Sequence, residues 1–400
     1  MDTSEIRRSF PVYQKDPNLI FFDSAASSLK VKDAIERVQH YNNELGVNAH
    51  RGAYSLAYET TSLYEDSRRA LASFIRAHED EIVFTRGTTS SLNMLAYALM
   101  DRIEPGDEII TSELEHHSSL LPWMNVARRK KARLIYVPLT AEGRITVEAF
   151  DSVLTDRTRI VALTHASNVM GYITPIASIA RSAHKKGALV ILDAAQSAPH
   201  MPLDVRELDV DFLAFSGHKM FAPTGIGILY GKREILNALD PVEFGGEMVD
   251  QVAKDQVIWK EPPLRFEAGT PNIAGVIGFH GAIDFIRRIG YDRIHERTKS
   301  IHEYTVAKLK AIDGVTVYNP TSENPIITFN IDGVHPHDAQ TVLDQEHIGV
   351  RAGHHCAQLV SRFLGVSSTI RASFHVYNDR RDCDALIEGV VKARDFFNAF

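Results

Sequence analysis

Five short apolar segments, separated by polar and helical sequence, restrict the fold of this chain more than any other feature. They are continuous apolar runs rather than alternating ones, which is typical of strands covered by helices on both faces of a sheet. The runs are LIYVPL at residues 134–139, RIVALTHAS at 159–167, ALVILDAAQ at 188–196, FLAFSGH at 212–218 and GIGILYG at 225–231. Helical patterns such as ITPIASIARSAHKKG, which closes with lysines and a glycine, lie between several of them. This order predicts a layered α/β domain with a mostly parallel sheet.

The pattern changes toward the C-terminus. Residues 243–272 are rich in glycine and proline and predict a long ordered loop, a feature that is more often functional than not. From about residue 287 the sequence predicts one long helix followed by short strands and helices. We therefore expect a large α/β domain over residues 21–286 and a small α+β domain formed by residues 1–20 and 287–400.

The composition limits the class and compartment of the protein. Hydrophobic residues make up 44% and charged residues 24% of the 400 positions, as in ordinary globular proteins. Two cysteines argue against a disulfide framework and fit a reducing compartment. The first residues lack an apolar signal segment, and no apolar run approaches the length of a membrane span. The net charge of −7 gives no reason to expect binding to nucleic acid. We expect a cytoplasmic protein that binds neither a membrane nor nucleic acid.

Polar residues follow two of the expected strands and a further short strand that precedes residue 87, at the edge where α/β sheets bind ligands. Asp193 follows an apolar strand, where a carboxylate needs a positive partner or several donors, although it could simply cap the following turn. Lys219 also follows a strand, and is either a surface lysine or a partly desolvated nucleophilic amine. Gly87, Thr88 and Thr89 precede an expected helix, whose N–H groups and hydroxyls could hold a phosphate or serve as a cap.

Together these three features are more specific than any one of them. An acid, a lysine 26 positions later and a hydroxyl-rich helix start describe a site for pyridoxal 5′-phosphate (PLP). In such a site the lysine binds the cofactor covalently, the acid keeps the pyridine nitrogen protonated, and the helix start holds the phosphate.

Several short motifs occur in the order, and at roughly the spacing, found in one enzyme family. They are FTRGTT, ELEHHSSLLPW, SNVMG, LDAAQ, FSGHK, RFEAGTPN and VRAGHHCA. On these motifs the chain resembles class V aminotransferase-fold enzymes, and among them the cysteine desulfurases of the group II (Suf) type, which are related to selenocysteine lyases. The match runs over residues 21–378. It implies the PLP-dependent transferase fold, fold type I. One departure is Ala222, where the family usually has glycine, which affects the expected loop geometry.

The resemblance implies a role for each matching residue. Lys219 would bind the cofactor and move protons, Asp193 would pair with the pyridine N–H, His116 would stack on the ring, and Cys356 would act as nucleophile. The residues implied to bind the cofactor are Thr88, Thr89, His116, Asn168, Asp193, Gln196, Ser216, His218, Lys219 and Thr270; those implied to bind the substrate are Arg371, Asn168, His50, Arg51 and Arg351. Gln196 would donate to the phenolic oxygen, and Thr270 would reach the phosphate of a neighbouring subunit.

The segment VRAGHHCAQ contains one of the two cysteines, Cys356. It could be a metal ligand, a nucleophile or an inert buried thiol. GHHC has none of the usual metal-ligand spacings, so no metal is expected. Arg351, His354 and His355 can all favour the thiolate over the thiol, and a nucleophile fits best. Cys383, at a polar helix start, is interpreted as a bystander.

The activity that the resemblance implies is conversion of L-cysteine to L-alanine. Sulfur would remain on Cys356 as a persulfide and pass to an acceptor or scaffold protein for iron–sulfur cluster assembly, in a homodimeric enzyme. The alternative is a selenocysteine lyase or another PLP-dependent C–S lyase. An aminotransferase proper and a non-catalytic assembly subunit are disfavoured, because the sequence contains GHHCA and retains Lys219.

Overall fold

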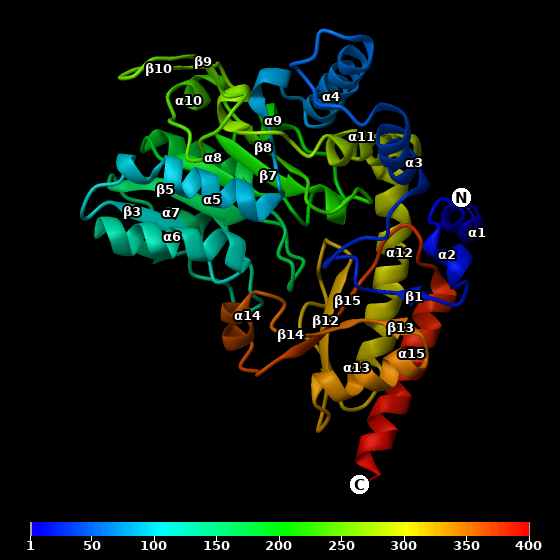
Figure 1. The fold of residues 1–400 in the computed structure, drawn as a ribbon. Coiled ribbons are helices and arrows are strands. Elements are labelled where there is room, and N and C mark those ends of the chain that lie inside the picture. The colour runs from blue at the N-terminus through cyan, green and yellow to red at the C-terminus, as the bar shows by residue number, and fades with distance from the viewer. Residues whose placement is uncertain (1, 400) are drawn as a thin grey trace.

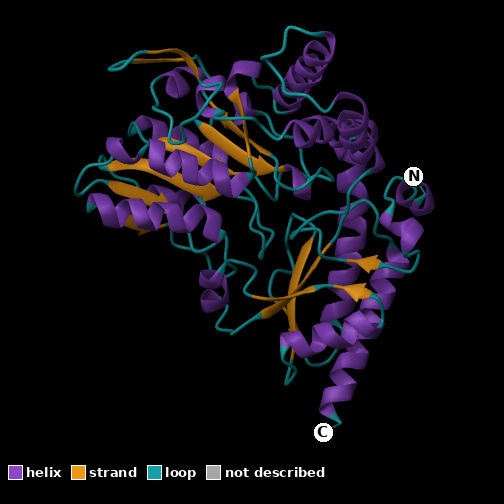
Figure 2. Ribbon diagram, viewed as in Figure 1, coloured by secondary structure: helices purple, strands orange, loops and turns teal. Residues whose placement is uncertain are grey.

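The structure is a computed structural model that describes residues 2–399 (Figure 1). It contains a seven-stranded and a four-stranded sheet in two separate regions, joined by loops and by the long helices α11 and α12 (Figures 1 and 2). No helix within the described residues is both long enough and apolar enough to cross a membrane.

The seven-stranded sheet forms the large region of the molecule. Its spatial order is β2-β8-β7-β6-β5-β3-β4, and β8 alone runs antiparallel to its neighbours β2 and β7. The strands are β2 (Ile82–Thr85), β3 (Glu108–Thr111), β4 (Arg133–Tyr136), β5 (Thr158–Thr164), β6 (Leu189–Asp193), β7 (Phe212–Ser216) and β8 (Gly227–Gly231). Each of the five apolar runs overlaps one of these strands, although β4 and β5 begin one residue before their runs, and the prediction of a mostly parallel sheet is confirmed.

Helices cover both faces of this sheet, which explains the continuous apolar runs. In β6, Val190 and Leu192 pack in a core with residues of α8 and α11, whereas Ile191 packs in a second core with residues of α5 and α6. Successive side chains of a strand point to opposite faces, so a strand covered on both sides is apolar at every position. The helices of this region are α3 (Lys32–His40), α4 (Ser55–Phe74), α5 (Thr88–Ala98), α6 (His117–Lys130), α7 (Val147–Asp151), α8 (Ile176–Lys185), α9 (Val205–Leu208), α10 (Arg233–Asn237) and α11 (Ile273–Ile289).

The four-stranded sheet is antiparallel, with the order β11-β12-β15-β14. Its strands and accompanying helices are β11 (Val315–Val317), β12 (Ile326–Ile331), β14 (Arg351–Gly353), β15 (Thr369–Ser373), α12 (Tyr291–Lys310), α13 (Pro336–Gln345), α14 (Gln358–Phe363) and α15 (Arg380–Asn398). Phe329 and Ile370 of the sheet lie in one hydrophobic core. The same core contains Leu309 of α12, Leu343 of α13 and Leu386 of α15. This core keeps β14 and β15 in place, and both strands contribute side chains to the site.

The N-terminal segment contacts both regions. Helices α1 (Thr3–Arg7) and α2 (Val12–Lys15) precede β1 (Ile20–Phe21), which pairs in parallel with β13 (Ile348–Gly349). Phe10 packs edge-on against Phe221 and Tyr377. Helix α11 continues past the expected boundary at residue 286 and ends at Ile289. The division into residues 21–286 and residues 1–20 with 287–400 remains a prediction.

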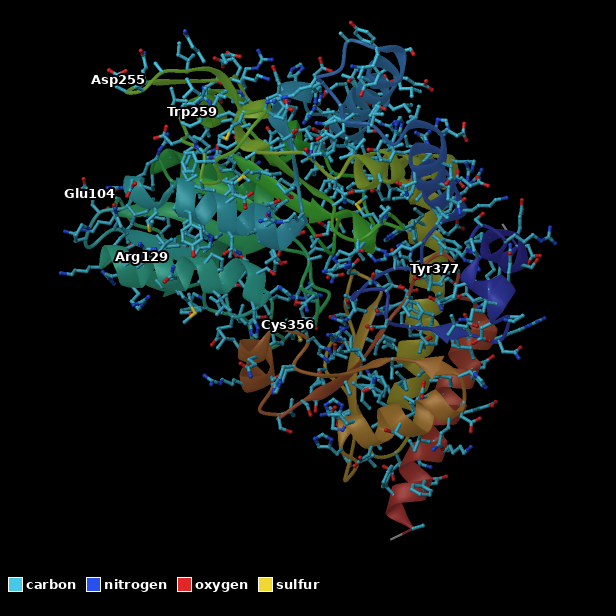
Figure 3. All side chains as sticks on the ribbon, in the orientation of Figure 1. Glu104, Arg129, Asp255, Trp259, Cys356 and Tyr377 are labelled. Carbon is cyan, nitrogen blue, oxygen red and sulfur yellow. The ribbon has the colours of Figure 1, made fainter. Side chains whose placement is uncertain are left out.

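The expectation of a long loop over residues 243–272 was wrong for part of that segment. It contains the antiparallel hairpin of β9 (Val249–Val252) and β10 (Val257–Trp259), which lies at the edge of the molecule (Figure 3). Most of the hairpin residues are exposed, as Val252 and Ile258 illustrate. Without a buried face, a strand has no alternation of apolar and polar residues for the sequence to reveal.

Candidate active site

The ends of β6 and β7 and the starts of α5 and α6 open onto a cavity of about 160 Å³. The region of the four-stranded sheet, called the small region below, closes this cavity from the other side. Figure 3 places Cys356 beside α14, facing the large region. Twelve of the residues expected at the site line this cavity: Thr88, Thr89, His116, Asn168, Asp193, Gln196, Ser216, His218, Lys219, Arg351, Cys356 and Arg371. They come from both sheets, so the folded chain brings together residues that are up to nearly 300 positions apart.

A carboxylate and an amine face each other at the strand ends. Asp193 is the last residue of β6; its side chain is buried and its Oδ1 accepts a hydrogen bond of 2.9 Å from the backbone N–H of Ala195. Burial raises the pKa of Asp193, and the charge of Lys219 opposes that shift. Burial lowers the pKa of Lys219 to about 8, against the opposing attraction of Asp193. Roughly a tenth of Lys219 is therefore a neutral, nucleophilic amine at pH 7, far more than for an ordinary lysine.

Both histidines that line the large-sheet side of the cavity are neutral. Burial, assisted by the charge of Lys219, lowers the pKa of His116 to about 3 and that of His218 to about 4. His116 is the N-cap residue of α6, and its Nδ1 atom accepts a hydrogen bond of 3.1 Å from the backbone N–H of Ser118. The proton of the neutral ring is therefore on Nε2.

Hydroxyl groups gather where α5 begins. The Oγ atom of Ser216 lies 2.8 Å from the backbone N of Thr88 and 2.7 Å from its Oγ1, and Thr89 Oγ1 lies 2.6 Å from Ser118 Oγ. Gly87 has a φ of 134°, and a Cβ there would lie 3.1 Å from Ser216 Oγ, so a side chain would crowd this cluster. Helix N–H groups and hydroxyls together suit an anion such as a phosphate.

Cys356 is carried by the short loop between β14 and α14. Its side chain is exposed, while the neighbouring His355 is buried. The sequence suggested that His355 favours the thiolate, but burial lowers the pKa of His355 to about 2, so the ring is neutral and contributes no positive charge. The cations that share the cavity with Cys356 are instead Lys219, Arg351 and Arg371.

Arg371 of β15 is a buried cation in the cavity wall that the four-stranded sheet contributes. Its Nη1 donates to the carbonyl oxygen of Asn168 at 2.8 Å, and its Nη2 donates to Asp23 Oδ1 at 3.3 Å. Among residues 2–399, its Nε has no hydrogen-bond partner, although it is buried. Arg351 lies 3.9 Å from the same Asp23 carboxylate. An unsatisfied guanidinium N–H in a cavity wall suits a carboxylate ligand.

Sequence reasoning missed several residues of the site. Asp23 joins the two arginines, and its only sequence signal was its place near the start of the matching segment, residues 21–378. Five residues that line the cavity were not expected there: Ala25, Ala26, Ser118, Thr164 and Ala195. The Nε2 of Gln196 donates to the carbonyl oxygen of Ala25 at 2.8 Å, which fixes this side chain in the wall.

Three of the expected site residues lie outside the cavity. His50 contacts Glu65 at 2.8 Å and Arg51 pairs with Glu247. Thr270 lines a separate surface hollow with Arg86. The role expected for Thr270 belongs to a neighbouring subunit and remains a prediction.

The residues in the cavity fit PLP. The buried carboxylate of Asp193 suits the pyridine nitrogen, and the amine of Lys219 suits the aldehyde. The hydroxyl-rich start of α5 suits the phosphate, and the unsatisfied Nε–H of Arg371 suits a substrate carboxylate.

Ala222 does not disturb this arrangement, because the positive φ in this turn, 64°, belongs to Phe221 instead. The alanine is compatible with the loop geometry.

Comparison with known proteins assigns the class. Residues 20–386 match the family described as aminotransferase class-V, so the chain belongs to the class-V aminotransferase family, which has the PLP-dependent fold. The chain is 46% identical to a "probable cysteine desulfurase" from Halalkalibacterium halodurans over 99% of both chains. It is also similar to the crystal structure of the cysteine desulfurase CsdA from Escherichia coli, with a TM-score of 0.93 and 38% identity over 99% of both chains. A cysteine desulfurase from Thermococcus onnurineus NA1 gives a TM-score of 0.94 at 38% identity, covering 99% of this chain and 98% of that one. The expected fold and family are confirmed.

Proposed function

We propose that this protein is a PLP-dependent cysteine desulfurase, which converts L-cysteine to L-alanine and keeps the sulfur on Cys356 as a persulfide. One observation supports this most directly: Lys219, Asp193 and Cys356, from three separate segments, line the same cavity. The relatives named as cysteine desulfurases support the same reaction.

The side chains of the large sheet would hold the cofactor and move protons. When bound, PLP supplies an electron sink that stabilises negative charge on the substrate Cα. Asp193 would pair with the pyridine N–H, and the neutral His116 ring would pack on the cofactor. Lys219, with its pKa lowered to about 8, can accept a proton from Cα near neutral pH and return it later. Thr88 and Ser216, whose hydroxyl oxygens lie 2.7 Å apart, would hold the phosphate.

The small sheet would bring the groups that bind and cleave the substrate. Arg371 has a free Nε–H for the substrate carboxylate. The Cys356 thiolate would attack the substrate sulfur, forming an S–S bond while the Cβ–S bond of the substrate breaks. The electron pair of the broken bond remains on Cβ, where a proton delivered by Lys219 completes the methyl group of alanine. The net change is L-cysteine plus an enzyme thiol giving L-alanine plus an enzyme persulfide.

Three further properties belong to this proposal. Cys356 is exposed, which would let an acceptor or scaffold protein for iron–sulfur cluster assembly collect the sulfur. A homodimer would bring Thr270 of one subunit to the cofactor phosphate of the other, the role that the motif RFEAGTPN implies. A cytoplasmic location agrees with two unpaired cysteines, one of which must remain reduced to react.

The test is a brief pulse of L-cysteine without reductant, followed by mass spectrometry of the Cys356 peptide. We expect a mass gain of one sulfur atom there, together with one alanine per site. The Cys356→Ala variant should lose persulfide and sulfide release while its cofactor absorbance persists, and Cys383→Ala should behave as the unsubstituted protein. Full activity of Cys356→Ala, or sulfur found only on Cys383, would contradict the proposal.

A further inference from the structure

The start of α6 contacts the loop that carries Cys356. The backbone N–H of His117 donates to the carbonyl oxygen of Cys356 at 2.8 Å. The backbone N–H of Gln358 donates to the ring Nε2 of His117 at 3.3 Å. A third hydrogen bond, 2.7 Å from Asn168 Nδ2 to the carbonyl oxygen of His355, ties the same loop to the large region. His117 therefore makes two of these three hydrogen bonds.

The two contacts of His117 join the starts of two helices. Helix α6 begins at His117 and α14 begins at Gln358, and the first N–H groups of a helix have no partner within the helix. Among the described residues, the N-cap of α14, Ala357, provides no side-chain hydrogen bond, so the ring of His117 takes the place of a cap. The N–H of His117 finds its acceptor in the Cys356 carbonyl, so each helix start satisfies a donor of the other.

The loop needs outside contacts because its backbone is strained. His355 has a φ of 53° and Cys356 a φ of 56°, so two consecutive non-glycine residues are left-handed. This conformation is unfavourable for residues with a Cβ and persists only where the surroundings hold it. Loss of a hydrogen bond at Gln358, two residues after Cys356, should let the loop relax away from the cavity.

The ring of His117 is in the state that this contact requires. An acceptor Nε2 exists only in the neutral ring with its proton on Nδ1. Burial of the half-exposed ring and the nearby His354 lower the pKa of His117, which favours the neutral form. A positive ring would also be unfavourable beside the two helix N-termini.

We propose that His117 is a positioning residue for sulfur transfer, whose ring acceptor holds the Cys356 loop in the cavity. This inference rests on the proposed desulfurase function and gives a role to a residue that does not line the cavity. Without the acceptor, the loop opens more often, so Cys356 meets the substrate sulfur less often. Loss of the acceptor should therefore make the loop amides exchange faster and the persulfide form more slowly.

The experiment uses the holoenzyme with two substitutions. His117→Leu removes the acceptor, whereas His117→Gln keeps an acceptor oxygen near the position of Nε2. Hydrogen exchange of a peptide covering residues 353–363 is measured without substrate, and persulfide on Cys356 is measured after a brief cysteine pulse. The peptide covering α15, residues 380–398, reports on general loosening, because it carries the buried Cys383.

We expect the loop peptide of His117→Leu to exchange about two- to tenfold faster, the effect of one net hydrogen bond on an equilibrium, and its persulfide to form measurably more slowly. His117→Gln should stay close to the unsubstituted protein, and cofactor absorbance and exchange of α15 should be unchanged in both variants.

The inference is overturned if loop exchange in His117→Leu is unchanged, if persulfide formation does not slow, or if His117→Gln behaves like His117→Leu. Faster exchange of α15 would also overturn it, since His117 would then stabilise the fold generally. Failure of the proposed function is a separate result: the unsubstituted protein would form no persulfide on Cys356, whereas the exchange measurement does not depend on catalysis.

Discussion

Replacement of Arg68 by glutamine should destabilise the protein far more than the same replacement of Arg69, the next residue of α4. The Arg68 guanidinium is buried and donates to both oxygens of Glu267, at 2.6 and 2.9 Å. The Arg69 side chain is 53% exposed and pairs with Asp66 and, at 3.8 Å, with Glu79. The two variants therefore make the same chemical change in two different environments.

The magnitude follows from what Arg68→Gln leaves behind. Glu267 would keep the backbone N–H of Phe84 at 2.7 Å and the hydroxyl of Tyr64 at 3.2 Å, but its buried carboxylate would lose its cation. Removing one partner of a buried ion pair costs about 3–5 kcal/mol, and the two remaining donors favour the lower end, about 3 kcal/mol. The exposed Arg69 pairs contribute only about 0–1 kcal/mol.

Thermal unfolding of the two variants, at one protein concentration and in the cofactor-free form, measures this difference. At about 2–4 °C per kcal/mol, the value for large domains, a loss of about 3 kcal/mol corresponds to a fall in Tm of roughly 6–12 °C, against about 0–4 °C for Arg69→Gln. Equal shifts for the two variants, or a shift below about 2 °C for Arg68→Gln, would refute the reasoning. The double variant Arg68→Met with Glu267→Gln should recover part of the loss, because no buried charge remains unpaired.

Three further predictions concern the site and the assembly. The rate at which PLP attaches to the cofactor-free protein should rise with pH to a plateau above about pH 8, because burial lowers the pKa of Lys219 to about 8 and only the neutral amine reacts; a rate that keeps rising toward pH 10.5, the ordinary pKa of lysine, would contradict this. Asp193→Asn should retain cofactor absorbance but lose about a hundredfold or more in turnover, as expected when a group facing developing charge is neutralised; near-normal turnover in a steady-state assay would exclude its role. Sedimentation should show a two-chain assembly, and Thr270→Ala should weaken PLP binding in it; a stable, fully active monomer would rule out the role expected for Thr270 across the interface.

Much of the large region could be predicted because its signals are local. Apolar runs report strands covered on both faces, and the ends of neighbouring parallel strands share one edge, so Asp193 and Lys219 could be expected to meet. The exposed hairpin of β9 and β10 had no such signal, since its strands bury no face. His50 and Arg51 were expected to bind the substrate. Within one chain they pair with Glu65 and Glu247 outside the cavity, and their expected role stays a prediction.

The sequence by itself determined the α/β fold and the residue types that the chemistry requires: an acid and an amine at strand ends, hydroxyls at a helix start, and one cysteine in a glycine-containing loop. Only the tertiary structure decided which charges these groups carry and which contacts hold them. Burial makes His355 neutral, Asp23 joins Arg371 to Arg351, and His117 supports the Cys356 loop. The physical reason is that hydrophobic periodicity is a property of neighbouring residues. Desolvation and hydrogen bonding at the site instead arise between segments that are hundreds of positions apart and meet only when the regions of the two sheets come together around the cavity.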